Sequence, residues 1–493
     1  MKRISRREID AASSGPFDSV GSNCAMPRTK IVCTIGPASR SPETLEQLIR
    51  AGMDVVRLNF SHGTPVEHLE VITAVRRIAA RTGRPIAILQ DLAGLKIRIG
   101  EVKSGAVTLQ AGAPFTLTTR EVLGSQQEVS VAYPRLTEDV QPGDSVLLSD
   151  GDLELEVIAT DGGDAHCRVI TGGTLASRKG VHLPAHSSTA PTFTDKDRDD
   201  LAFGLRYGVD YVALSTIRTA GDVLEARGMI QHHGSTVPLV AKIETADALS
   251  NIDEIIDSAD GVMVARGDLG LAIPLATVPR LQKMLIGKAN RAGKPVITAT
   301  HMLRSMQDHP TPTRAEATDV ANAVLDGTDA VMLSEETAIG QYPIEAVTMM
   351  AAIAADAELN FPFDAWIRRF ETGGHLPEAV ARAACALAAD IDAAAIITCT
   401  QSGGTARRVA QYRPRAPILA PTPHAETYRR LALIWGVAPL LNPGQPTTDE
   451  LINGALDAAL AAGRAQRGDT VVITAGVPAG HPGMTNLIKV ETL

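Results

Sequence analysis

Aromatic residues make up only 3% of this 493-residue chain, and its five cysteines are scattered without a CxxC pair. This cysteine usage argues against a disulfide framework or a cysteine-ligated metal site and is typical of a reduced, cytoplasmic protein. No apolar run approaches membrane-spanning length, and residues 1–25 lack the apolar core of a secretory signal. We therefore expect a cytoplasmic protein without a membrane partner.

The chain also lacks an excess of positive charge and a phosphate-binding loop motif. Its formal net charge of −9 argues against general binding to nucleic acid, so any cationic site must be a local focus for a small anion. The pattern GxxxxGK[ST] does not occur, which excludes a P-loop NTPase as a motif interpretation.

What the chain does contain is a repeated alternation of short apolar runs with helical patterns. Eight such runs occur, and a count of eight strand–helix units with a parallel sheet predicts an α/β fold of the (β/α)8 TIM-barrel type. The expected strands are 30–35, 54–58, 86–89, 210–214, 238–241, 261–264, 295–298 and 329–333. The expected helices are 42–51, 66–81, 195–207, 219–232, 246–258, 277–292 and 313–326.

Two segments do not continue this alternation of barrel strands and helices. Residues 92–191 show alternating patterns and turn dipeptides, which predict a small all-β domain inserted in the barrel as a lid. From 355 to 493 the alternation restarts as a C-terminal α/β domain, with helices at 377–390 and 405–412, strands at 395–398, 417–421 and 471–474, and loops around 412–423 and 439–446. The catalytic barrel is thus expected at 26–91 and 192–354. Residues 1–25 are read as a disordered tail, with Met26 as an alternative start.

Polar clusters follow six of the expected barrel strands. The carboxyl ends of barrel strands meet at one rim, where such folds place their sites. Lys242 and Glu244 follow one strand, and Asp268 follows the next. Two carboxylates from neighbouring strands suit Mg²⁺, and a lysine beside them suits an anionic substrate. Arg57 offers a planar fork for phosphate or carboxylate.

Several long motifs occur in a fixed order and carry a resemblance. They are RTKIVCTIGPAS at 28–39, RLNFSHG at 57–63, AKIET at 241–245, MVARGDLG at 263–270, NRAGKPVITATHML at 290–303 and PTRAEATDVANAVLDGTDAVMLS at 312–334. From about residue 28 to its end, the chain resembles the pyruvate kinases. The resemblance implies a glycolytic phosphotransferase with a barrel, an inserted lid and a regulatory C-terminal domain, assembled as a homotetramer.

The implied reaction transfers the phosphoryl group of phosphoenolpyruvate to ADP, giving pyruvate and ATP. By matching motif, the resemblance implies Mg²⁺, with Mn²⁺ as a substitute, on Glu244 and Asp268, and a catalytic Lys242. It places Arg57, Gly267, Asp268 and Thr300 on the substrate and counts Arg57 and Thr300 among the catalytic residues. It places Asn59, His62, Arg98 and Lys179 on the nucleotide side. Thr300 and Ser334 are candidates for the relay that protonates the enolate.

The family's monovalent-cation site maps onto Asn59, Ser61 and Asp91. Potassium-dependent members carry Thr directly after that aspartate and Glu five residues after it, where this chain has Leu92 and Lys96. This pattern resembles the potassium-independent branch. A lysine ammonium at that place would supply the charge of a potassium ion, so K⁺ is expected not to be required. The alternative is that Lys96 points to solvent.

The resemblance also implies an effector loop in the C-terminal domain. Residues Thr400, Ser402, Gly403 and Thr405 lie where a helix opens, and hydroxyls and N–H groups there suit a phosphate. An ordinary helix cap is the simpler interpretation. A monophosphate effector, such as a sugar phosphate or AMP, or no effector at all, is expected rather than a bisphosphate, because the segment 475–480 lacks the Trp and Arg of bisphosphate-responsive relatives. Two rival functions are a non-catalytic sugar-phosphate sensor, which would require loss of rim residues that are intact here, and a Mg²⁺-dependent pyruvate-handling lyase.

Overall fold

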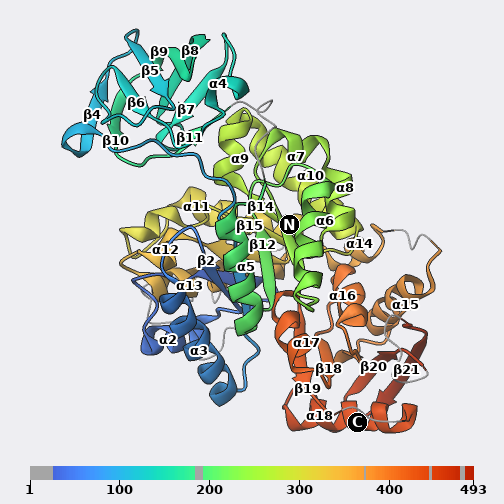
Figure 1. Cartoon of the computed structure of the whole chain (residues 1–493). Helices are drawn as coiled ribbons and strands as arrows, with labels where there is room; N and C mark the ends of the chain where they lie inside the picture. The colour runs from blue at the N-terminus through green and yellow to red at the C-terminus, as the bar shows by residue number, and fades with distance from the viewer. Residues whose placement is uncertain (1–25, 184–191, 371–373, 444–446, 478–483) are drawn as a thin grey trace, which may run out of the picture.

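The structure is a computed structural model, and it describes residues 26–183, 192–370, 374–443, 447–477 and 484–493. The expected disordered tail at 1–25 lies outside these residues. Within them, eight parallel strands close into a barrel in the order β1-β16-β15-β14-β13-β12-β3-β2 (Figure 1). Their bounds are β1 Lys30–Thr34, β2 Val55–Asn59, β3 Ala87–Asp91, β12 Tyr211–Leu214, β13 Leu239–Ile243, β14 Gly261–Ala265, β15 Val296–Ala299 and β16 Ala330–Leu333. The predicted TIM barrel is confirmed.

The barrel has a core inside its strands and a second one between the strands and the surrounding helices. Small and branched side chains such as Val32, Val240 and Ile297 fill the interior, so the barrel is packed rather than hollow. Ala432 and Leu433 of the C-terminal domain join this interior cluster. That domain therefore closes the end of the barrel at which the strands begin.

The outer helices follow the expected segments closely. They are α2 Pro42–Ala51, α3 Pro65–Thr82, α5 Asp195–Tyr207, α6 Ala220–His232, α10 Val278–Arg291 and α11 Arg314–Asp326. Local signals fix several starts, because Thr64 and Glu67 form a capping box at α3 and Thr194 and Asp197 form one at α5.

The prediction of one continuous helix at 246–258 is wrong. The structure divides it into α7 Ala246–Ser250 and α8 Ile252–Ser258. Asn251 lies at the break, and its side-chain amide donates to the carbonyl of Arg218 at 3.0 Å. An asparagine that bonds to a loop competes with the helical backbone, which accounts for the interruption.

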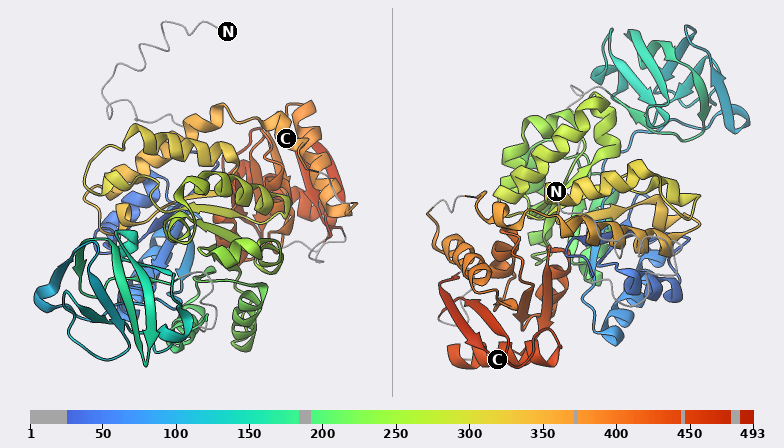
Figure 2. Two further views of the ribbon diagram at one scale, coloured as in Figure 1. Left: turned by 90° about the horizontal axis from the view of Figure 1, so that it is seen from above. Right: turned by 180° about the vertical axis from the view of Figure 1, so that it is seen from behind.

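The inserted all-β segment forms two sheets. β4 Ala106–Leu109 pairs with β10 Gly173–Ala176, and a six-stranded sheet has the order β11-β7-β8-β9-β5-β6. The bounds of these six are β5 Pro114–Thr118, β6 Glu128–Ser130, β7 Ser145–Leu148, β8 Leu153–Asp161, β9 Asp164–Thr171 and β11 Val181–His182. The segment has its own hydrophobic core and projects from one side of the barrel (Figure 2). It meets the barrel at α9 (Arg266–Ala272), where Gly151 lies against Leu271.

The C-terminal domain is a five-stranded sheet in the order β19-β18-β17-β20-β21, flanked by helices. Its strands are β17 Ala395–Thr398, β18 Ile418–Thr422, β19 Val437–Leu441, β20 Thr470–Ala475 and β21 Leu487–Thr492. Its helices include α15 Leu376–Asp390, α16 Gly404–Gln411, α17 Ala425–Arg430 and α18 Thr448–Ala461. Between the barrel and this domain lies α13, Pro343–Leu359.

The expected loop at 439–446 is wrong over its first part, because β19 continues through Pro439 to Leu441. A proline is compatible with this strand because β19 lies at an edge of the sheet, where a missing N–H removes no central ladder bond. Among the described residues, every helix is too short or too polar to cross a membrane.

Candidate active site

The rim formed by the carboxyl ends of the barrel strands carries a connected set of charged and hydroxyl groups. Thr34 ends β1, Arg57 lies on β2, and Asp91 ends β3. Ser215 follows β12, Lys242 lies on β13, and Thr300 follows β15. Parallel strands closed into a barrel bring all these positions to one place, although they are far apart in the sequence.

Asp91 lies at the centre of this set. Its Oδ2 accepts a hydrogen bond from Nε of Arg57 at 2.6 Å, and its Oδ1 lies 3.2 Å from Nζ of Lys242. The carboxylate is 1% exposed. Burial acts to raise the pKa of Asp91, but the nearby charges of Arg57 and Lys242 outweigh it and leave the pKa below its usual value. Asp91 is therefore ionised and ties two cations together.

Lys242 is buried among acceptors. Besides Asp91, its ammonium lies 2.8 Å from Oε1 of Glu244 and donates to Oγ of Ser215 at 2.7 Å. Burial would lower the pKa of Lys242, but the two carboxylates more than compensate and raise it. The side chain is therefore a fixed positive charge rather than a proton acceptor at neutral pH.

Glu244 and Asp268 form the pair of carboxylates expected to hold a divalent cation. Glu244 is 6% exposed and its Oε2 accepts from the backbone N–H of Thr216 at 2.8 Å. Burial raises the pKa of Glu244, Lys242 opposes this shift, and the negative charge of Asp268 reinforces it. Two neighbouring carboxylates that repel each other in this way form a donor set that suits a hard divalent cation.

Thr300 and Gly267 form the opposite wall of the site. The N–H of Gly267 donates to Oγ1 of Thr300 at 2.7 Å, and that hydroxyl donates to the carbonyl of Ala299 at 2.6 Å. Thr300 has a φ of +66°, which is uncommon for a β-branched residue and is held by surrounding contacts. One such contact comes from Arg266, whose Nη2 donates to the carbonyl of Thr300 at 2.7 Å.

The residues expected on the nucleotide side come from two parts of the chain: Asn59 ends β2 and His62 follows it, whereas Arg98 and Lys179 belong to the inserted β segment. Arg98 donates from Nη1 to the carbonyl of Arg178 at 2.9 Å, while Lys179 is exposed. Burial and then the charges of Lys96, Arg98 and Arg57 lower the pKa of His62, so these four side chains share one neighbourhood.

The expected monovalent-cation residues are only partly brought together. Oδ1 of Asn59 accepts from the N–H of Ser61 at 3.1 Å. The ion pairs found for Asp91 among the described residues are with Arg57 and Lys242, while Lys96 is exposed. The role expected for Lys96 therefore stays a prediction.

Three residues of the rim were not predicted from the sequence. Thr34 accepts from Nη1 of Arg57 at 2.8 Å, Ser215 accepts from Lys242, and the backbone of Thr216 binds Glu244. Each follows or ends an apolar strand, which is the only signal the sequence offers for them. Together they extend the polar rim to the first and fourth strands of the barrel.

The four residues expected in the effector loop lie around the start of α16. Oγ1 of Thr400 accepts from the N–H of Gly403 at 3.0 Å, and Gly403 has a φ of +83°. The hydroxyl of Thr405 bonds to that of Thr485 at 2.8 Å. The N-cap of α16 is Gly403, which offers no side-chain cap, so the bond between Thr400 and Gly403 lies within the loop before the helix. The hydroxyl of Ser402 is exposed.

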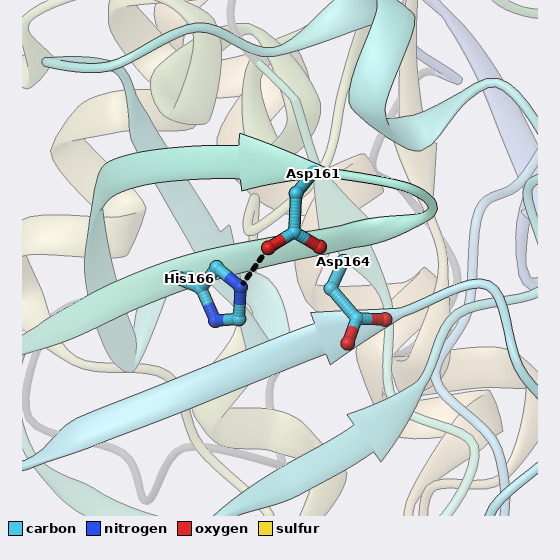
Figure 3. Close-up of side chains that lie close together, drawn as sticks. All are labelled: Asp161, Asp164 and His166. Atoms are coloured by element: carbon cyan, nitrogen blue, oxygen red, sulfur yellow. Dashed lines mark hydrogen bonds and ion pairs between the residues drawn. The ribbon is translucent and has the colours of Figure 1, made fainter.

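A further cluster with metal-ligand chemistry lies in the lid, where Asp161, Asp164 and His166 flank the β8–β9 turn (Figure 3). Nε2 of His166 lies 3.0 Å from Asp161. Asp164 already accepts from Thr118 at 2.5 Å and from Nη2 of Arg120 at 2.8 Å. Because Arg120 already supplies a positive charge to Asp164, we assign no metal here.

The fold and rim define a class of protein: a TIM-barrel enzyme with an inserted β domain and an α/β domain at its carboxyl end. Residues 26–347 match the family model for the barrel domain of pyruvate kinase, and residues 378–491 match the model for its alpha/beta domain. The chain belongs to the pyruvate kinase family and is a phosphotransferase with the activity of that family.

Named relatives support this assignment over nearly the whole chain. A pyruvate kinase of Geobacillus stearothermophilus is 50% identical over 471 residues, covering 94% of this chain and 80% of the relative. One of Clostridium acetobutylicum is 45% identical over 472 residues, covering 95% of this chain and all of the relative. The crystal structure of a pyruvate kinase from Cryptosporidium parvum is similar with a TM-score of 0.89 at 38% identity, covering 94% of this chain and 96% of that one.

Proposed function

We propose that the rim around Lys242 carries out phosphoryl transfer from phosphoenolpyruvate to ADP. The observation that carries the proposal is the position of Lys242, whose ammonium lies between Asp91 and Glu244 at 3.2 and 2.8 Å. Phosphoryl transfer depends on positioning and on neutralising the charge of the transferred group rather than on covalent catalysis. A buried and permanently charged lysine, held by several acceptors, is suited to that task.

Arg57, Gly267, Asp268 and Thr300 are proposed to bind the phosphoenolpyruvate, with Arg57 and Thr300 also acting in catalysis. Arg57 contributes its guanidinium, fixed by Asp91 and Thr34. Thr300 is oriented by its bonds to Gly267 and Ala299. Ser334 is proposed to share the proton relay with Thr300, because its buried Oγ has no partner among the described residues.

Glu244 and Asp268 are proposed to hold Mg²⁺ or Mn²⁺. Burial raises the pKa of Glu244 and the negative charge of Asp268 adds to this shift, so a bound divalent cation would relieve the repulsion between the two carboxylates. When bound, the metal would act as a Lewis acid for the phosphoryl oxygens. In this arrangement Lys242 holds Glu244 in place, and the N–H of Thr216 fixes its second oxygen.

Asn59, His62, Arg98 and Lys179 are proposed to contact ADP. The β-rich segment 92–191 is proposed to act as a lid over the rim. His182 on β11 supports this proposal, because burial lowers its pKa and the negative charge of Asp268 opposes that shift, as expected for a strand near the rim. Lys96 is proposed to replace K⁺ near Asn59, Ser61 and Asp91.

Regulation and assembly are proposed by family resemblance. The loop containing Thr400, Ser402, Gly403 and Thr405 is proposed to bind a sugar phosphate or AMP, with exposed Ser402 as its free hydroxyl. A cytoplasmic, glycolytic homotetramer is proposed from the same resemblance.

The experiment is pyruvate release from phosphoenolpyruvate and ADP, measured with and without Mg²⁺ in the wild-type protein and in Glu244→Gln. The wild type should turn over only with the divalent cation. The variant should need at least about tenfold more Mg²⁺, because one charged ligand is lost. Glu225→Gln, which alters an exposed glutamate paired with Arg198, is the matched control. The assignment fails if the wild type is inactive in all conditions or if Glu244→Gln retains the wild-type Mg²⁺ dependence.

A further inference from the structure

A cavity of about 470 Å³ lies away from the rim, between the base of the barrel and α17 of the C-terminal domain. This volume is within the range of small-molecule sites, roughly 300–1,000 Å³. The barrel lines it with the end of α5, the turn before β12 and the segment after α6, and α17 supplies the other wall. The barrel and the C-terminal domain therefore face each other across this cavity.

Arginines dominate the charge of this cavity. Arg206 lines it from α5, and Arg429 and Arg430 line it from α17. A fourth, Arg76, reaches Asp210 in its wall at 2.7 Å. Asp210 and Glu426 are the two carboxylates among the lining residues that the structure describes. Among the lining residues, three guanidinium groups against two carboxylates leave a surplus of one positive charge, in a chain whose net charge is −9.

Both oxygens of the Asp210 carboxylate already accept hydrogen bonds from the protein. Its Oδ2 accepts from Arg76 and from the N–H of Ile88 at 2.8 Å, while its Oδ1 accepts from Nε of Arg429 at 2.8 Å. Asp210 therefore does not compensate the remaining arginines. It holds Arg429 in place and thus fixes one side of the cavity.

Arg206 and Arg430 carry the uncompensated charge. Arg430 is bound only loosely to Glu426, at 3.4 Å, and its Nε is buried without a partner among the described residues. Arg206 has no carboxylate of the described residues within ion-pair distance. Its guanidinium lies 5.5 Å from the centre of the Tyr207 ring. A buried guanidinium N–H without an acceptor is costly, so the site favours an anion that supplies one.

We propose that this cavity binds a phosphate dianion, carried by a small phosphomonoester or present as free phosphate. A dianion can pair with Arg206 and Arg430 together, since neither is closely bound to a carboxylate, and guanidinium forks match the geometry of phosphate oxygens. Ser235 and Thr236 also line the cavity and add hydroxyl groups. Bound there, the anion joins the barrel to the C-terminal domain through Arg206 on one side and Arg430 on the other.

The same cavity adjoins a strand that leads to the catalytic rim. Asp210 lies directly before β12, and Ser215, which accepts from Lys242, lies directly after it. The hydroxyl of Tyr211, the first residue of β12, donates to the carbonyl of Arg430 at 2.8 Å. The proposed anion therefore sits against the near end of a four-residue strand whose far end adjoins the lysine.

The test is calorimetric titration of the full-length protein with inorganic phosphate, glycerol 3-phosphate and, as a neutral control, glycerol. Arg206→Ala should weaken phosphate binding by about tenfold or more, the loss expected for one charge-assisted contact. Arg206→Lys should recover much of the affinity, and Arg430→Gln should also weaken binding. Arg198→Ala is the matched control, because Arg198 lies on the same helix but pairs with Glu225.

Tighter binding of glycerol 3-phosphate than of phosphate identifies an ester as the ligand, and equal binding identifies free phosphate. Phosphate that binds at the rim or at the loop around Ser402 is unaffected by Arg206→Ala, so those sites are distinguished from this one. The proposal is overturned if neither probe binds, if glycerol alone binds equally well, or if Arg206→Ala and Arg430→Gln both bind as the wild type does.

Discussion

The carboxylate of Asp91 lies 3.2 Å from the ammonium of Lys242 and is one of the two acidic groups that hold this lysine. Because its other oxygen binds Arg57, a single buried aspartate sets the separation of two cationic side chains on the rim. Mutual repulsion would otherwise drive Arg57 and Lys242 apart. Asp91 is thus a positioning residue for both.

Replacing Asp91 by asparagine should therefore impair catalysis while leaving both cations present. We expect kcat/KM for phosphoenolpyruvate to fall by about 100-fold, since misplacement of catalytic groups by about 1 Å has an effect of this size. Steady-state kinetics at saturating ADP and Mg²⁺ measures it. Asp199→Asn, at an exposed position on α5, is the control and should behave as the wild type. A loss smaller than threefold in Asp91→Asn, roughly 0.7 kcal/mol, would contradict this role.

Much of the barrel was predictable because each strand is a short apolar run buried on both faces, such as Gly261–Ala265. The rim was predictable where a strand ended in charge, as at Lys242. Thr34 and Ser215 were not, because a single hydroxyl after a strand differs little from an ordinary loop residue. Their role emerges only when strand closure places them beside Arg57 and Lys242.

In the C-terminal domain, two elements were not predicted correctly from the sequence, for different reasons. The end of β19, from Pro439 to Leu441, was assigned to a loop because Pro and Gly cluster at 439–446. The place of β19 at the sheet edge makes that proline acceptable in a strand. α18 was not predicted, although Thr447 and Glu450 form the capping box that marks its start. The strand β19 could be recognised only from its place in the sheet, whereas α18 could have been predicted from its capping box in the sequence.

Lys96 offers a direct test of the monovalent-cation hypothesis. We expect the wild type to be fully active without K⁺ and Lys96→Glu to lose activity in K⁺-free buffer, with recovery when K⁺ is added, because the variant needs an external cation in place of the ammonium. Initial rates with tetramethylammonium or potassium as the salt measure this, with Lys103→Glu in the lid as the control. A wild type that requires K⁺, or a Lys96→Glu variant indifferent to it, rules out the replacement.

His68 predicts how stability responds to acid. Its ring stacks on Phe60 with centroids 4.2 Å apart, and burial lowers its pKa. The unfolded chain then binds a proton near pH 6.5 while the folded chain does not, so stability is lost as the pH falls through that value. A lowering by one unit corresponds to about 1.4 kcal/mol.

The measurement is the melting temperature at pH 7.5 and pH 5.0. We expect the drop on acidification to be smaller in His68→Gln than in the wild type, because glutamine takes up no proton. His309→Gln, which replaces an exposed histidine, is the matched control. An equal drop in His68→Gln and the wild type would show that His68 does not contribute.

Gly204 and Gly228 predict opposite outcomes for the same substitution. Both lie inside helices, α5 and α6, where alanine is ordinarily favoured over glycine by about 1 kcal/mol. A Cβ on Gly204 would lie 1.9 Å from Oε1 of Gln90, whereas one on Gly228 meets nothing within 4 Å. Gln90 cannot easily yield, because it is buried and its Nε2 donates to the carbonyl of Asp200 at 2.6 Å. Gly204→Ala should therefore destabilise the barrel by about 1–3 kcal/mol through overpacking, and Gly228→Ala should stabilise it slightly. Thermal or urea unfolding of the two variants side by side checks both signs, and a stabilised Gly204→Ala would mean that Gln90 can move away from α5.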